Sequence, residues 1–193
     1  MQATQVQHYT PEEYLKLEEA ADFKSEYRNG KIIPNISNSI NHNRILGNFA
    51  AAAHFALNQY EVFIANLRLW IPKKRIFTYP HAMIVAGEPK CYSDRTDTIT
   101  NPQVIIEVLS ASTEDYDRQG KYRAYRSIST FQEYLLIDQS CISVEHYSKT
   151  GKKKWSMQEY DEEDEAIEFT SVPFQISLAD LYQKVKFEAI EQQ

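Results

Sequence analysis

Glu107 is the residue with the clearest chemical potential, because it is the one acid in the otherwise apolar run from Val104 to Leu109. A carboxylate in a buried strand is costly unless it is hydrogen-bonded, paired with a cation or bound to a metal. One interpretation is a strand-end acid that bonds nearby backbone or an arginine. The other is a metal-binding acid, and the residues that follow it bear on the choice.

Asp117 and Lys121 are four residues apart in a predicted helix, so they share one face of that helix. Strand alternation puts Glu107 on the same side of its strand as Ile105 and Leu109. If the helix packs back on the sheet, Lys121 can approach Glu107, where an ammonium group beside a metal would steer water and balance phosphate charge. An exposed ion pair between Asp117 and Lys121 is the alternative.

The elements that must position these residues follow from the turn signals and the apolar periodicity. Thr10-Pro11 predicts a helix start, and Asn29-Gly30 between two extended runs predicts a hairpin. A strand, a helix and a strand between residues 104 and 138 predict one parallel crossover, and the later strands predict an antiparallel meander. The remaining helices are expected at 41–59, 112–126 and 177–185, and the strands at 62–64, 68–71, 81–85, 104–109, 134–138, 142–147, 154–160 and 166–169.

The composition indicates one globular domain, which we expect to span residues 1–193, with 42% hydrophobic and 25% charged residues. No run of about 18 apolar residues predicts a membrane span. Met1 to Gln5 lacks the blocks of a signal peptide, and Cys91 and Cys141 form no CxxC pair. These features predict a cytoplasmic protein, and the net charge of -6 excludes binding to nucleic acid through overall basic charge.

An ordered set of residues resembles the Uma-two family of restriction endonucleases, within the PD-(D/E)XK nuclease superfamily, over most of the chain. The resemblance implies an α/β fold, a restriction-endonuclease-like mixed β-sheet flanked by helices, and metal-dependent cleavage of DNA. Its most specific part runs from Glu107 to Thr113 with Asp117 and Lys121. The full set is Glu26, Gly30, His42, Tyr79-Pro80, Pro102, Ile106 to Ser110, Ser112, Thr113, Asp117, Lys121 and Glu133-Tyr134.

The resemblance also implies roles for individual residues. Glu107 matches an acid that binds one or two Mg²⁺ ions, and Glu26 matches an additional acid. The usual lysine two positions after the strand acid is absent, since Leu109 stands there, and Lys121 matches the lysine of the following helix. The implied catalytic residues are therefore Glu26, Glu107 and Lys121, acting on DNA. Superfamily members are often dimers, so a homodimer is possible.

The sequence departs from the family at His81, where the family carries an aspartate after the proline. Mg²⁺ prefers oxygen ligands, whereas Mn²⁺ also accepts imidazole. The predicted metal ligands are Glu26, His81 and Glu107, with Mg²⁺ or Mn²⁺ as the ion and Mn²⁺ favoured. The alternative is a catalytically degenerate nuclease-fold protein that acts as a nucleic-acid-binding or interaction module. Asp94 and Asp97 are the nearby acids that could replace the lost oxygen.

Other polar residues carry weaker signals. His42 fits either a helix cap or a residue at the rim of the site. Several basic residues are candidates for DNA contacts, or else ordinary solvated turns, and Trp70 and Trp155 lie close to two of their clusters. These basic residues are Lys73, Lys74, Arg75, Lys121, Arg123, Arg126, Lys152, Lys153 and Lys154.

Overall fold

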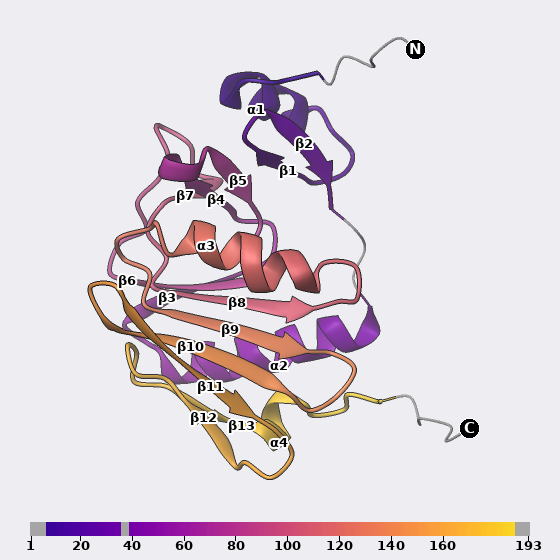
Figure 1. The fold of residues 1–193 in the computed structure, drawn as a ribbon, viewed down its shortest axis with the longest axis vertical. Coiled ribbons are helices and arrows are strands. Elements are labelled where there is room, and N and C mark those ends of the chain that lie inside the picture. The colour runs from indigo at the N-terminus through magenta and orange to yellow at the C-terminus, as the bar shows by residue number, and fades with distance from the viewer. Residues whose placement is uncertain (1–6, 36–38, 188–193) are drawn as a thin grey trace.

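The computed structural model of the chain describes residues 7–35 and 39–187, so the prediction for Met1 to Gln5 lies outside the described residues. Two large sheets and a two-stranded sheet form the framework (Figure 1). The five-stranded sheet has the order β2-β1-β5-β4-β7, and the six-stranded sheet has the order β11-β10-β9-β8-β6-β3. The predicted α/β class with a mixed sheet flanked by helices is confirmed.

The strands are β1 (Ser25–Arg28), β2 (Lys31–Pro34), β3 (Tyr60–Ile64), β4 (Arg68–Ile71), β5 (Ile76–Thr78), β6 (Ala82–Ala86), β7 (Thr98–Ile99), β8 (Val104–Leu109), β9 (Glu133–Asp138), β10 (Val144–Gly151), β11 (Lys154–Tyr160), β12 (Ala166–Glu168) and β13 (Gln175–Ser177). The helices are α1 (Pro11–Glu19), α2 (Ile40–Ala56), α3 (Tyr122–Tyr125) and α4 (Leu178–Leu181). A 3₁₀ turn, η1 (Pro72–Lys74), precedes β5, and a π-helical turn, η2 (Tyr116–Lys121), runs directly into α3. None of these helices is long and apolar enough to cross a bilayer.

The six-stranded sheet lies between α2 on one face and η2 with α3 on the other (Figure 1). Strand β8 is buried along its whole length, and its side chains alternate between the two faces. Val104, Ile106 and Val108 join the core that contains α2, whereas Ile105 and Leu109 join the core that contains α3. The alternation therefore places Glu107 on the face that α3 covers, as the sequence predicts.

The predicted parallel crossover is present in the structure, whereas the predicted meander is present only in part. Strands β8 and β9 are parallel neighbours, and β10 and β11 continue antiparallel from β9, as predicted. The expectation that residues 166–169 extend this meander is wrong, because β12 pairs with β13 in a separate sheet. The reason is apolar burial: Phe169 and Phe174 pack on Phe49 of α2, so the hairpin covers the core instead of lengthening the sheet.

The hairpin of β1 and β2 carries Glu26 to the site. Asn29 and Gly30 have φ values of 46° and 94°, which is the left-handed backbone that a two-residue hairpin turn needs. Strand β1 also pairs antiparallel with β5, a strand too short for the sequence pattern to indicate. This second pairing brings Glu26 beside Thr78 at the end of β5.

Candidate active site

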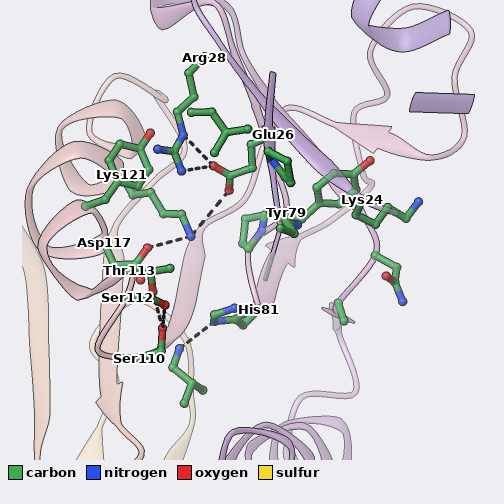
Figure 2. Close-up of a pocket in the computed structure, with 18 of the residues that line it drawn as sticks. Lys24, Glu26, Arg28, Tyr79, His81, Ser110, Ser112, Thr113, Asp117 and Lys121 are labelled. Carbon is green, nitrogen blue, oxygen red and sulfur yellow. Dashed lines mark hydrogen bonds and ion pairs between the residues drawn. The ribbon is translucent and has the colours of Figure 1, made fainter. Parts of the chain in front are cut away.

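The predicted site residues meet at a pocket of about 470 Å³ between the β1–β2 hairpin, the start of β6, the end of β8 and η2 (Figure 2). Glu26, His81, Asp117 and Lys121 line this pocket. Glu107 is fully buried directly behind it, in contact with His81 and Lys121. Residues far apart in the chain are therefore brought to one place.

Lys121 is the centre of the charge cluster. Its Nζ lies 2.9 Å from Glu107 Oε1. The same atom lies 2.9 Å from Asp117 Oδ1 and 3.9 Å from Glu26 Oε1 (Figure 2). Burial alone would lower the pKa of Lys121, but the three carboxylates outweigh burial and raise it above its ordinary value. The ammonium group is therefore kept charged although only 7% of the residue is exposed.

Glu107 is held by partners on both oxygens. Oε1 accepts hydrogen bonds from Lys121 Nζ and, at 2.7 Å, from the Tyr125 hydroxyl. Oε2 lies 2.9 Å from His81 Nδ1. Burial alone would raise the pKa of Glu107, but the charge of Lys121, and after it His81, lowers the pKa well below its ordinary value. Glu107 is therefore a carboxylate at neutral pH, fixed in one orientation.

Asp117 is the buried acid whose charge is least compensated. Its Oδ1 contacts Lys121, but neither carboxylate oxygen has a well-aligned hydrogen bond within the described residues. Burial raises the pKa of Asp117, Lys121 opposes that rise, and nearby Glu107 adds to it, so the pKa lies above its ordinary value. Asp117 thus carries negative charge less readily than Glu107 does.

His81 has two contacts at Nδ1 that require opposite protonation states. The amide of Val108 donates a hydrogen bond to Nδ1 at 2.9 Å, which requires an unprotonated nitrogen. Glu107 Oε2 is equally close to the same atom, and it is a favourable neighbour only if Nδ1 carries a proton or shares a cation with it. His81 Nδ1 and Glu107 Oε2 thus lie side by side, next to the pocket.

Glu26 is tied to two neighbours outside the predicted set. Its Oε1 accepts a hydrogen bond from Thr78 Oγ1, and its Oε2 accepts two from Arg28, from Nε at 2.9 Å and from Nη2 at 2.5 Å. The guanidinium of Arg28 lies over the ring of Tyr116, with its carbon 3.4 Å from the ring centroid. Glu26 therefore fixes Arg28 at the pocket wall.

Two of the three predicted metal ligands have the spacing that a divalent ion needs, although the Val108 amide occupies the lone pair of His81 Nδ1. Ligands at about 2.1 Å in adjacent octahedral positions lie about 3.0 Å apart, which the 2.9 Å between His81 Nδ1 and Glu107 Oε2 matches. Glu26 would have to release Arg28 or Thr78 to join them. Within residues 7–35 and 39–187, no three or more His, Cys, Asp or Glu side chains are already grouped as metal ligands.

Three weaker candidates do not line the pocket. His42 is buried with its ring edge-on to His81 and its centroid 4.3 Å away, and burial, followed by His81, lowers its pKa to about 4. The helix cap at this end is Ser39, which accepts a hydrogen bond from the His42 amide. Asp97 is bound through both oxygens by Arg95, which lowers its pKa to about 2. Asp94 and Asp97 therefore contribute no carboxylate to the pocket.

The cations at the pocket differ from most of the predicted ones. Of the predicted basic residues, Lys121 alone is among the pocket-lining residues, and the other two cations there are Lys24 and Arg28. Trp70 is buried on Phe77 and is not available for stacking on a base. The sequence held signals for the residues it missed: Arg28 is two positions from Glu26 on one strand, and Tyr125 is one helical turn beyond Lys121.

Glu133 is one of the residues that carry the family resemblance, but in this structure it holds two segments together. Its buried carboxylate accepts hydrogen bonds from the amides of Thr170 and Ser171 and contacts His146 Nε2 at 2.7 Å. These contacts tie β9 to the loop between β12 and β13. Glu133 is not a pocket-lining residue.

Gly120 allows the aromatic ring of Tyr116 to lie against η2. A Cβ at residue 120 would sit closer than 3.0 Å to two ring carbons of Tyr116, so Gly120→Ala is expected to displace the ring that supports Arg28. Such overpacking costs about 1–3 kcal/mol. Urea unfolding would measure this loss, and Gly47→Ala is the control, since open space surrounds Gly47 in α2. Equal stabilities of the parent and Gly120→Ala would contradict this packing role.

Comparison with known proteins identifies a family and a shared fold. Residues 11–180 match the model of the Uma2 family, described as "Putative restriction endonuclease". Two uncharacterized proteins of Synechocystis sp. are similar: sll1609 is 43% identical over 163 residues, covering 83% of this chain and 92% of that protein, and slr1290 is 31% identical over 182 residues, covering 92% and 93%. The crystal structure of a "putative nuclease belonging to DUF820" from Anabaena variabilis shares the fold, with a TM-score of 0.74, 21% identity and coverage of 90% of this chain and 97% of that one.

Proposed function

Because this chain belongs to the Uma2 family of putative restriction endonucleases, we propose that it is an endonuclease that hydrolyses phosphodiester bonds of DNA with a divalent metal ion. The observation that carries the proposal is the contact of Glu107 with both Lys121 and His81 behind one open pocket. A nuclease family indicates a nucleic acid substrate. DNA and the dependence on metal are the parts that we propose.

Glu107 and His81 would hold the ion, and the imidazole favours Mn²⁺ over Mg²⁺. When bound, the ion supplies a polarised phosphoryl oxygen and a water molecule that loses its proton more readily. The Tyr125 hydroxyl fixes the direction of the Glu107 carboxylate, because it donates to the oxygen that does not face His81. The carboxylate thus needs no reorganisation to present Oε2 beside His81.

Lys121 would bind and stabilise the scissile phosphate. An ammonium group has three hydrogen-bond donors; Glu107 accepts one of them, and Asp117 Oδ1 lies 2.9 Å away without a well-aligned hydrogen bond. A donor that these two acids do not take is available to a water molecule or a phosphate oxygen in the pocket. A cation held in place before the substrate arrives stabilises developing negative charge without further rearrangement.

A specific observation favours a second candidate, a degenerate nuclease fold that binds nucleic acid or another partner without cleaving. The lone pair of His81 Nδ1 is already used by the Val108 amide, so an ion must displace that hydrogen bond before it binds. An aspartate at residue 81 would offer a second oxygen and avoid this competition. The two candidates therefore differ in what His81→Asp should do.

Nicking of supercoiled plasmid DNA distinguishes the candidates. We expect the parent protein to nick the plasmid in Mn²⁺, more slowly in Mg²⁺, and not in EDTA. His81→Asp should shift the preference toward Mg²⁺, because carboxylate oxygen suits that ion. An inert parent whose His81→Asp variant gains Mg²⁺-dependent nicking would establish the degenerate candidate, and inertness of both proteins in both metals would contradict the endonuclease proposal.

A further inference from the structure

Strand β1 carries a row of alternating charges along one wall of the pocket. Lys24, just before the strand, and Glu26 and Arg28 within it are spaced two residues apart, and all three line the pocket. Tyr27 points the other way and is fully buried in the core beneath. The Lys24 carbonyl accepts a hydrogen bond from Asn35, so the extended pairing of the hairpin includes Lys24. The row therefore lies on a strand that is paired with β2 on one side and with β5 on the other.

The cations of this row are accessible, whereas the nearby acids are not. Lys24 is exposed and 26% of the Arg28 side chain is exposed. Glu26 is 3% exposed, and Asp117 and Glu107 are fully buried. An incoming polyanion therefore meets positive charge first, although the chain as a whole carries a net charge of -6.

Arg28 is positioned in advance for a phosphate group. Glu26 holds Nε and Nη2, and Tyr116 lies against the guanidinium plane, while Nη1 makes no hydrogen bond to another described residue. An arginine that is already fixed loses little side-chain freedom on binding and offers a directional donor to a phosphate oxygen. Lys24, with its Nζ 5.2 Å from the centroid of the Tyr79 ring, adds a more mobile positive charge at the other end of the row.

We propose that Lys24 and Arg28 form a track that binds the phosphates on either side of the phosphate that is cleaved. Four residues of strand separate them by about 13 Å, and a DNA strand presents a phosphate every ~3.4 Å along the helix axis, so the two cations contact different phosphates. Glu26 lies between them (Figure 2), and Lys121 approaches from η2 on the opposite wall. The proposal rests on the endonuclease proposal for the substrate class.

Salt dependence of DNA binding tests the track without any cleavage. Affinity of each protein for a fluorescein-labelled DNA duplex would be measured by anisotropy in EDTA, between about 50 and 200 mM salt. Each lost phosphate contact should reduce the slope of log affinity against log salt by about 0.9, so Lys24→Gln and Arg28→Gln should each show that reduction. The Arg28→Lys variant should keep the slope, because it keeps the positive charge. It should bind DNA more weakly, because lysine lacks the planar guanidinium with its paired hydrogen-bond donors.

Lys31→Gln is the matched control, since Lys31 is an exposed cation on β2 of the same hairpin and does not line the pocket. It should leave the slope unchanged. Unchanged slopes for Lys24→Gln and Arg28→Gln, or an equal reduction for Lys31→Gln, would overturn the track even if the parent nicks plasmid. If the two variants show reduced slopes but the parent does not nick plasmid, the result would support the track and count against the endonuclease proposal. A parent that does not bind the duplex at the lowest salt would overturn the track.

Discussion

Glu107→Gln is expected to lower the rate of DNA nicking by at least about 10²–10³-fold, the usual loss when one preorganised electrostatic group is removed from an active site. The amide has the size of the carboxylate but lacks its charge, so it would hold an ion poorly at Oε2 beside His81. The amide oxygen of the introduced glutamine could still accept the hydrogen bonds from Tyr125 and Lys121, but it would carry no charge. Initial rates on supercoiled plasmid in Mn²⁺ would measure the loss.

Glu133→Gln is the matched control for that experiment. Glu133 is also a fully buried acid, on the neighbouring strand β9, but its partners are loop amides and His146. We expect this control to lower the thermal midpoint and to keep most of the nicking rate. If Glu107→Gln nicked as fast as the parent, Glu107 would have no part in the chemistry.

Lys121→Met is expected to cause the largest loss of stability, about 3–5 kcal/mol at neutral pH, because it leaves buried carboxylates without their cation. Lys121 makes close contacts with both Glu107 and Asp117, and both acids are fully buried. Urea unfolding of the parent and the variant would measure the difference. The double variant Lys121→Met/Glu107→Gln should recover part of the loss, since it removes one of the unpaired charges.

The effect of Lys121→Met should also depend on pH. In the parent, Lys121 holds the folded-state pKa of Glu107 below its unfolded value, so this stabilisation is present above the unfolded pKa of about 4.3 and is lost as pH falls. Without Lys121, burial is the main influence and raises the pKa of Glu107, so the variant loses stability as pH rises through that region. The difference between the two proteins should therefore shrink as pH falls. A difference below about 1 kcal/mol at neutral pH would contradict the central role of Lys121.

The sequence predicts the parts of this site that depend on local periodicity. Alternation along β8 places Glu107 on the face opposite Val108, and the four-residue spacing of Asp117 and Lys121 puts both on one face of the helical segment. These are local relations, so the sequence contains them directly. The hairpin at Asn29-Gly30 is predicted for the same reason.

Contacts that depend on pairing between distant segments are beyond such reasoning. The hydrogen bond between Thr78 and Glu26 forms because β1 pairs with β5. A strand of three residues, such as β5, is too short to show an alternation of apolar and polar residues in the sequence. The departure of β12 from the six-stranded sheet depends on where Phe169 and Phe174 meet α2. The π-helical turn η2, in which the Tyr116 ring lies against Gly120, is likewise absent from the sequence prediction of an ordinary helix. Such π-helical turns are rare and occur frequently at functional sites.

Calorimetric titration with Mn²⁺ is the most direct test of an ion site shared by Glu107 and His81. The parent protein should bind Mn²⁺ more tightly than Mg²⁺, and Glu107→Gln should abolish the Mn²⁺ heat at the same protein concentration, while Glu133→Gln should retain it. If Glu107→Gln bound Mn²⁺ as the parent does, the ion would lie elsewhere and this pocket would not be its site.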